Sequence, residues 1–214
     1  MSFDIFRRAV LGLGLHPEVC RVMSTLDRGV FSTSPLAYSL KDPAPILDDP
    51  PINMTAADLH AEALNVIYKH FGDTKRQPKS ALDVGTGTGY VATALNMLFP
   101  SLQLIKGIDI LEPLITKARN IQKELGGNVI LFERENVFSL DKSEKYDIIH
   151  GGATVHQDLK SMLEHLNPGG IMIMPFSTNN QLEVLGLWKK SLDNKLSGPE
   201  ILGYVRYTPM VKEE

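Results

Sequence analysis

The sequence is poor in the features that mark secreted, membrane-spanning and nucleic-acid-binding proteins. Its 214 residues include one cysteine, Cys20, so an internal disulfide framework is excluded and a reducing compartment is expected. No apolar run approaches the roughly 20 residues that a transmembrane helix needs. The net charge is −3 and no stretch is rich in lysine or arginine, which argues against nucleic acid as a partner. We therefore expect a cytoplasmic globular protein that does not bind membranes.

Metal-ligand patterns are also missing, because no His, Cys and Asp cluster has the spacing of a metal site, and no metal is expected. The length favours one domain over residues 1–214, with 43% hydrophobic residues to fill a core. We divide it into residues 1–79, with N-terminal helices and a loop that binds substrate, and residues 80–214, which form the core. Nothing suggests an oligomer, and a monomer is expected.

Strands and helices alternate along residues 80–214. Apolar runs predict strands over residues 81–84, 104–108, 129–133, 146–150, 171–175, 183–190 and 201–207. Helical spacing predicts helices over residues 3–11, 17–26, 55–71, 90–98, 112–125 and 159–166. This alternation predicts an α/β fold, with a doubly wound, mostly parallel sheet and helices on both faces. Residues 32–51, which contain five prolines, are expected to lack regular structure, and long loops of this kind are often functional.

The most informative stretch is residues 81–90, a short apolar strand that ends in Asp83 and continues as a glycine-rich turn into a helix. Gly85, Gly87 and Gly89 form G-x-G-x-G, because Tyr90 stands where a dinucleotide fingerprint has its last glycine. Asp83 would repel a pyrophosphate. The loop therefore favours a ligand with a cationic or neutral centre. Such a ligand is expected to bind at the carboxyl ends of the strands.

Other polar residues end the neighbouring strands. Asp109 ends the second strand, where it can accept hydrogen bonds from ribose hydroxyls or cap a turn. Glu135 and Asn136 follow the third strand and can contact an adenine amine or form a turn. His150 ends the fourth strand, as a structural histidine or as a substrate contact. All these positions are expected on one rim of the sheet.

Beyond this loop, the chain resembles class I S-adenosylmethionine-dependent methyltransferases, and among them the protein-L-isoaspartate O-methyltransferases. The resemblance is carried by residues 26–28, 54–61, 146–153, 166–175 and 204–210 together with the glycine loop. It implies a Rossmann-like fold, S-adenosyl-L-methionine as cofactor, and isoaspartyl-containing peptides and proteins as substrates in protein repair. The implied cofactor contacts are His60, Asp83, Gly85, Thr86, Gly87, Gly89, Asp109, Ile110, Glu135 and Asn136.

The same resemblance places Thr55 in the active site, where the family has a serine, although Thr55 is also a candidate N-cap. The implied substrate-side residues are Asp58, His150, Gly151 and Ala153. Asp58 departs from the family pattern, and it either faces the acceptor or points away as an acid in the first turn of a helix. Val211 stands where the family commonly has a threonine.

Three functions remain open on the sequence. The first is an isoaspartyl protein methyltransferase that acts in protein repair by transferring a methyl group to a side-chain or α-carboxylate. The second is a methyltransferase of the same class with another acceptor, since Asp58 and residues 32–51 differ from the family. The third is an inactive cofactor-binding or interaction module with the same fold.

Overall fold

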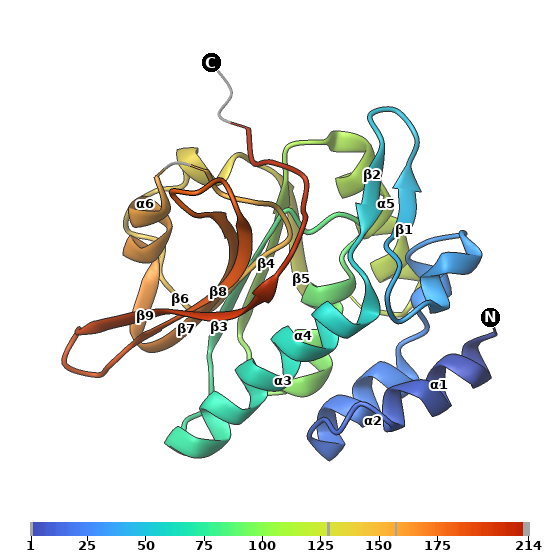
Figure 1. Cartoon of the computed structure of the whole chain (residues 1–214), viewed down its shortest axis with the longest axis horizontal. Helices are drawn as coiled ribbons and strands as arrows, with labels where there is room; N and C mark the ends of the chain where they lie inside the picture. Colours follow the sequence, from blue (N-terminus) through green and yellow to red (C-terminus); the bar gives the residue numbers. More distant parts are fainter. Residues whose placement is uncertain (1, 128, 157, 212–214) are drawn as a thin grey trace.

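The computed structural model describes residues 2–127, 129–156 and 158–211, and a seven-stranded sheet lies at its centre (Figure 1). The strand order is β5-β4-β3-β6-β7-β8-β9. The first five strands in this order pair in parallel, and β8 and β9 add antiparallel strands at one edge. The expected α/β class with a mostly parallel sheet is confirmed.

The elements follow the predicted alternation closely. The strands are β1 (Ala44–Leu47), β2 (Ile52–Met54), β3 (Ser80–Val84), β4 (Leu104–Asp109), β5 (Ile130–Arg134), β6 (Tyr146–Gly151), β7 (Leu166–Ser177), β8 (Glu183–Lys190) and β9 (Leu196–Tyr204). The α-helices are α1 (Phe3–Leu11), α2 (Pro17–Thr25), α3 (Ala57–Thr74), α4 (Tyr90–Leu98), α5 (Glu112–Glu124) and α6 (Leu159–Glu164). Short 3-10 turns are η1 (Arg28–Val30), η2 (Pro35–Tyr38) and η3 (Val137–Ser139).

The two faces of the sheet are covered differently. Alternate residues of each strand point to opposite faces, so Ile105 and Ile148 join one apolar cluster while Ile108 and Ile149 join the other. The first cluster packs against α1 to α5, and it includes apolar residues from the N-terminal part of the chain. The second packs against α6 and η3, a much lighter cover. The carboxyl ends of β3 to β6 emerge between these layers.

Residues 32–51 are more regular than expected. They contain η2 and the strand β1, which pairs antiparallel with β2 to form a hairpin on the right in Figure 1. The prolines misled the prediction because Pro45 is tolerated in a two-stranded edge, where it need not donate a ladder hydrogen bond. The hairpin packs over the glycine loop, since the Ile46 side chain lies 3.1 Å from where a Cβ on Gly87 would be.

Three further expectations needed correction. Ala56 rather than Thr55 precedes the first turn of α3, so Thr55 is not its N-cap. The strand expected over residues 171–175 is longer: β7 begins at Leu166, and the Asn-Pro-Gly-Gly segment lies inside it, where the pairing with β6 shifts register between Leu166 and Ile171. The helix expected over residues 159–166 ends at Glu164, and the buried His165 that follows it bonds the carbonyl of Glu144 through Nδ1 at 2.9 Å.

Candidate functional site

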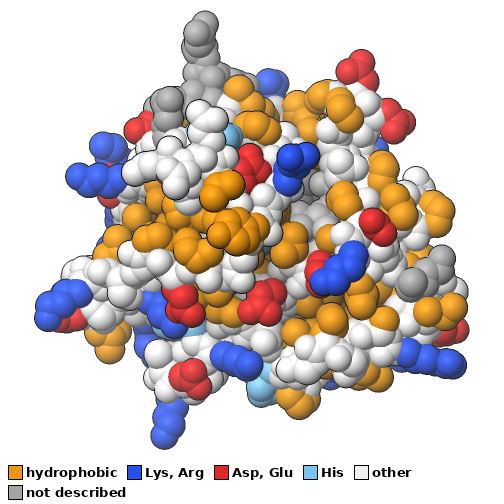
Figure 2. All heavy atoms as spheres, in the orientation of Figure 1, with side chains coloured by type: hydrophobic (Ala, Val, Ile, Leu, Met, Phe, Trp, Pro, Cys, Tyr) orange, Lys and Arg blue, Asp and Glu red, His pale blue; other side chains and the backbone are white. Residues whose placement is uncertain are grey.

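A cavity of about 320 Å³ lies at the carboxyl ends of β3, β4, β5 and β6, the size of a small-ligand site. Its floor is the glycine loop, one wall is the β1–β2 hairpin, and another is residues 208–211. On the face drawn in Figure 2, acidic and basic side chains are interspersed, without an extended field of one sign. The predicted residues that line the cavity are Thr55, His60, Asp83, Gly85, Thr86, Gly87, Asp109, Ile110, Glu135, Asn136, His150 and Ala153.

The glycine loop is shaped by Asp83, which is buried and does not act as a free carboxylate. One of its oxygens accepts a hydrogen bond from the Thr86 hydroxyl at 2.7 Å and another from the backbone N–H of Ala92 in α4 at 3.2 Å. Gly85 and Gly87 have φ values of +67° and +58°, which residues with a Cβ rarely adopt. The chain therefore turns sharply from β3 into α4 and leaves its backbone open to the cavity.

Asp109 braces this loop from the end of β4. Its carboxylate accepts hydrogen bonds from the N–H groups of Gly87 and Leu111, both at 3.1 Å. Burial raises the pKa of Asp109, and these two hydrogen bonds lower it by a smaller amount. Asp109 thus caps a turn, as one reading of the sequence expected, and also lines the cavity.

His60 and Arg28 form a buried pair at one side of the cavity. Arg28 is fully buried, and its guanidinium donates to the Nδ1 atom of His60 at 2.9 Å, to the carbonyl of Thr55 at 2.7 Å and to the carbonyl of Ala37 at 2.8 Å. Because arginine can only donate, Nδ1 of His60 must accept, which leaves Nε2 as the protonated nitrogen. His60 is therefore a neutral side chain with one N–H to offer.

His150 pairs with Asp83 across adjacent strands. The two residues lie opposite each other in the parallel register of β3 and β6, and Nδ1 of His150 lies 2.7 Å from the Asp83 carboxylate. Both side chains are almost fully buried. The centres of the His60 and His150 rings are 6.3 Å apart. Asp83, His150 and His60, which come from three separate segments, therefore lie together in the lining of the cavity.

The protonation of His60 predicts a pH dependence of stability. Burial, together with the positive charge of Arg28, holds the pKa of His60 well below its ordinary 6.5. Below pH 6.5 the unfolded chain therefore takes up a proton that the folded protein does not. We expect the free energy of unfolding to fall by up to about 1.4 kcal/mol per pH unit from this residue, until the folded pKa is reached. Urea unfolding of the wild type and of His60→Gln between pH 7 and 5 measures this contribution. An equal pH dependence of the free energy of unfolding in both proteins would contradict a lowered pKa of His60.

Thr55 lies at the cavity just before α3, and the Tyr207 phenol lies close to its side chain. Burial raises the pKa of the Tyr207 phenol to about 12, so this hydroxyl stays protonated at neutral pH. Two residues that are far apart in the sequence are thus neighbours at the cavity. Sequence reasoning did not single out Tyr207.

Three predicted residues lie outside the cavity lining. Asp58 turns to the exposed Lys41 at 2.6 Å and also accepts from the N–H of Leu59, so it is an acid at the start of α3. Gly151 packs against Met174, and Gly89, with φ of +90°, packs against Phe132. Both glycines allow close packing behind the site without facing it.

Glu135 and Asn136 line the cavity but are already engaged. One oxygen of Glu135 lies 2.6 Å from the ammonium group of Lys106. The Asn136 side chain accepts from the N–H of Phe138 and donates to the carbonyl of Val211, both at 3.1 Å. Asn136 thereby ties η3 to the C-terminal segment.

The walls contain most of the residues that sequence reasoning missed. They are Ile46, Pro50, Ile52, Asn53, Met54, Val84, Thr88, Tyr90, Val91, Ile108, Leu111, Leu114, Val137, Phe138, Gly152, Thr208, Pro209, Met210 and Val211. Ile46, Pro50, Met54, Val84, Thr88, Tyr90, Gly152 and residues 208–211 fall in segments that composition, the glycine loop or the family resemblance had marked, but none was proposed as a site residue. The others are apolar apart from Asn53, and their contribution depends on three-dimensional packing.

Within the three described ranges, no group of three or more His, Cys, Asp and Glu side chains could hold a metal ion. The same ranges contain no helix with the length and apolar character needed to cross a membrane.

A glycine loop after the first strand of a parallel sheet, an acid after the second and a cavity between them are the arrangement of the class I methyltransferase fold. The family model described as protein-L-isoaspartate(D-aspartate) O-methyltransferase matches residues 7–214. The chain belongs to this family, and is a protein carboxyl methyltransferase that uses S-adenosylmethionine and acts on isoaspartyl residues.

Individual proteins that are similar to this chain have the same family name. Protein-L-isoaspartate O-methyltransferase 1 of Arabidopsis thaliana is 25% identical over 95% of this chain and 87% of its own. The protein-L-isoaspartate O-methyltransferase of Triticum aestivum is 29% identical over 90% of this chain and 83% of its own. A solved Plasmodium falciparum structure, described as a protein-L-isoaspartate O-methyltransferase in complex with S-adenosyl-L-homocysteine, has a TM-score of 0.83 at 19% identity and covers all of both chains. That last likeness shows the fold.

Proposed function

We propose that the cavity is the active site for methylation of isoaspartyl carboxylates in damaged proteins, with the cofactor on the glycine loop and the acceptor beside Thr55. The observation that carries this proposal is that Thr55 and His60 border the same cavity as Gly85 and Gly87. The two positive-φ glycines leave room for close approach of a ligand, and the apolar walls suit a purine ring. The residues present therefore fit S-adenosylmethionine.

On the cofactor side, we assign the methionine part to the loop from Asp83 to Gly87 and the ribose to Asp109. His60 offers its Nε2–H, and Arg28 polarises that donor through Nδ1. When bound, the sulfonium supplies the methyl group. Ile110 and residues 135–138 enclose the other end of the cavity.

On the acceptor side, no strong general base is needed because a carboxylate is already ionised at neutral pH. Thr55 orients the acceptor oxygen by donating its hydroxyl proton. His150 and Ala153 border the acceptor. The buried walls exclude water, so opposite charges react in a site where their attraction is weakly screened. Asp58 is neutralised by Lys41 and does not repel the substrate.

The direct test uses radiolabelled S-adenosylmethionine with an isoaspartyl peptide and the matching aspartyl peptide. Label that enters only the isoaspartyl peptide is the expected result. Cofactor binding without transfer would instead favour a different acceptor or an inactive module. No binding would overturn the assignment of the cavity.

Thr55→Val tests the acceptor side. Valine keeps the shape and removes the hydroxyl, so we expect kcat to fall about 10- to 100-fold, the cost of a hydrogen bond to a charged group, while Kd for S-adenosylhomocysteine changes little. Thr55→Ser is expected to keep most of the activity. Thr116→Val, on the exposed face of α5, is the matched control. Unchanged turnover in Thr55→Val would remove Thr55 from the mechanism.

We further propose that the protein works as a monomer in the cytoplasm. A single cysteine that is buried suits a reducing compartment, and the proposed site is built from one chain. Sedimentation velocity with the purified protein tests the monomer.

A further inference from the structure

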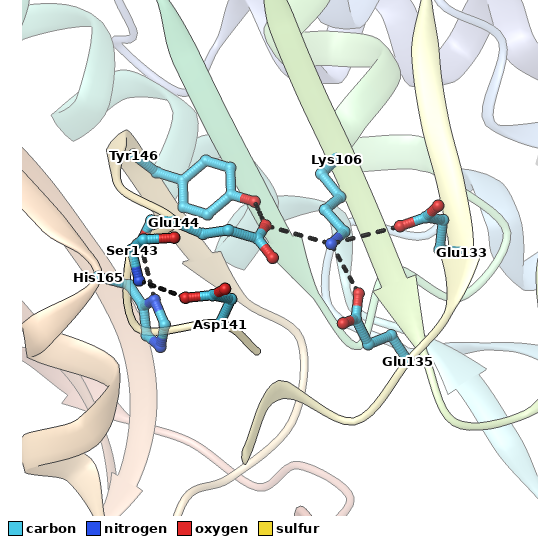
Figure 3. Close-up of polar contacts among 8 residues, drawn as sticks. All are labelled: Lys106, Glu133, Glu135, Asp141, Ser143, Glu144, Tyr146 and His165. Carbon is cyan, nitrogen blue, oxygen red and sulfur yellow. Dashed lines mark hydrogen bonds and ion pairs between the residues drawn. The ribbon is translucent and has the colours of Figure 1, made fainter. Parts of the chain in front are cut away.

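A buried ammonium group is surrounded by carboxylates on the lightly covered face of the sheet. Lys106 of β4 has a nearly buried side chain, and its Nζ atom lies 2.6 Å from Glu135, 3.2 Å from Glu144 and 3.3 Å from Glu133. Figure 3 shows the three glutamates pointing toward Lys106 from both sides of the strand. The Tyr146 hydroxyl donates to Glu144 and extends the cluster. Burial lowers the pKa of Lys106, but the glutamates outweigh it and raise the pKa overall, so the group is charged.

The glutamates come from the two ends of one connection. Glu133 lies in β5 and Glu135 directly follows it, while Glu144 lies just before β6. A crossover between parallel strands usually contains an α-helix that packs on the sheet. Here the described connection, residues 135–145, contains only η3. Lys106 therefore draws together both ends of a segment whose described residues form no α-helix.

This connection is also a wall of the cavity. Glu135, Asn136, Val137 and Phe138 all line it, opposite the glycine loop. One oxygen of Glu135 is bound by Lys106, which fixes the rotamer of the side chain and offsets its charge. A carboxylate held in this way has only acceptor atoms to offer a ligand.

We propose that Lys106 is a positioning residue for the purine end of the cofactor: it fixes Glu135 as an acceptor, and thereby selects a 6-aminopurine over a 6-oxopurine. This inference rests on the proposed function, because it places the purine beside residues 135–138. A 6-amino group donates to a carboxylate, whereas a 6-oxo group meets it with another acceptor. Sites built around such a hydrogen bond reject analogues that lack it.

The test measures Kd by calorimetry for S-adenosylhomocysteine and for its 6-oxo analogue, S-inosylhomocysteine. The wild type is expected to prefer the adenosyl compound. In Lys106→Met, the adenosyl affinity should fall about 10-fold or more while the inosyl affinity changes less, so that discrimination decreases. Lys106→Arg, which keeps a charged donor, should restore discrimination.

Lys145→Met is the matched control, because Lys145 lies on the same connection but bonds the carbonyls of Lys142 and Glu164. It should leave discrimination unchanged. If Lys106→Met does not fold, Glu135→Gln provides the second test: an amide can offer either a donor or an acceptor, so the inosyl compound should gain relative to the adenosyl one. Undiminished discrimination in the folded variants, or an equal loss for both compounds, would overturn the proposal.

The two proposals fail in different ways. A wild type that binds S-adenosylhomocysteine with the expected selectivity but does not methylate an isoaspartyl peptide would contradict the acceptor and leave the role of Lys106 supported. A wild type that methylates the peptide but does not distinguish the two nucleosides would contradict only the role of Lys106.

Discussion

Arg28→Met is expected to lower the free energy of unfolding by about 3 kcal/mol. The substitution removes the donor from two carbonyl oxygens, those of Ala37 and Thr55, and from Nδ1 of His60. Each buried acceptor that loses its partner costs about 1 to 3 kcal/mol, and removing a buried cation offsets part of that sum. Methyl transfer should fall as well, since Thr55 and His60 both border the cavity. Urea unfolding and the peptide assay measure the two effects.

The matched control is Arg21→Met. Arg21 lies on the exposed side of α2 and pairs with Glu18 at 2.8 Å. Exposed pairs contribute little, so this variant should stay within about 0.5 kcal/mol of the wild type. Equal denaturation midpoints for the two arginine variants would show that the buried hydrogen bonds of Arg28 do not stabilise the fold.

Gly152→Ala is expected to weaken binding of S-adenosylhomocysteine about 100-fold. A Cβ at this position would lie 2.4 Å from the carbonyl oxygen of Gly85, a backbone atom that cannot rotate away. The chain after β6 and the glycine loop would have to separate, although Gly152 is held to β3 by a 2.7 Å hydrogen bond to the carbonyl of Val84. Overpacking of this kind costs about 1 to 3 kcal/mol, and a displacement of about 1 Å in a binding site can reduce function about 100-fold.

Gly203→Ala is the control for this substitution, because a Cβ there would contact nothing within 4 Å. It should bind the cofactor product like the wild type. Calorimetry compares the variants, and near-ultraviolet circular dichroism confirms that each is folded. Gly152→Ala with wild-type affinity would show that the glycine loop tolerates displacement or does not hold the ligand.

The architecture was predictable because it depends on periodic local signals. Apolar runs of strand length alternated with helical spacing, and the acids at the strand ends marked one rim of the sheet. Asp83 and Asp109 therefore lie where the sequence placed them. The hairpin of residues 44–54 was missed, because its pairing depends on contacts between strands and not on the composition of either one.

The partners within the site were not predictable, because they depend on register and on packing between distant segments. Asp83 and His150 are 67 residues apart and become neighbours only through the parallel pairing of β3 and β6. The tautomer of His60 is set by Arg28, 32 residues away. Glu135 was expected either to contact an adenine amine or to form a turn, and its pairing with Lys106, which lies among the apolar residues of β4, was not foreseen. Such a lysine is a usable signal, since a buried ammonium group requires carboxylate partners.

The C-terminal wall has a consequence for synthesis on the ribosome. Residues 208–211 join the rest of the cavity through backbone hydrogen bonds between Thr154 and both Thr208 and Met210, and through Asn136 and Val211. Every other lining residue is translated before them. A nascent chain can thus assemble the glycine loop and the hairpin while the pocket is still open on this side. Its full enclosure comes only after residue 211 has left the exit tunnel, so a nascent chain that exposes only the residues before Thr208 lacks the completed cofactor pocket.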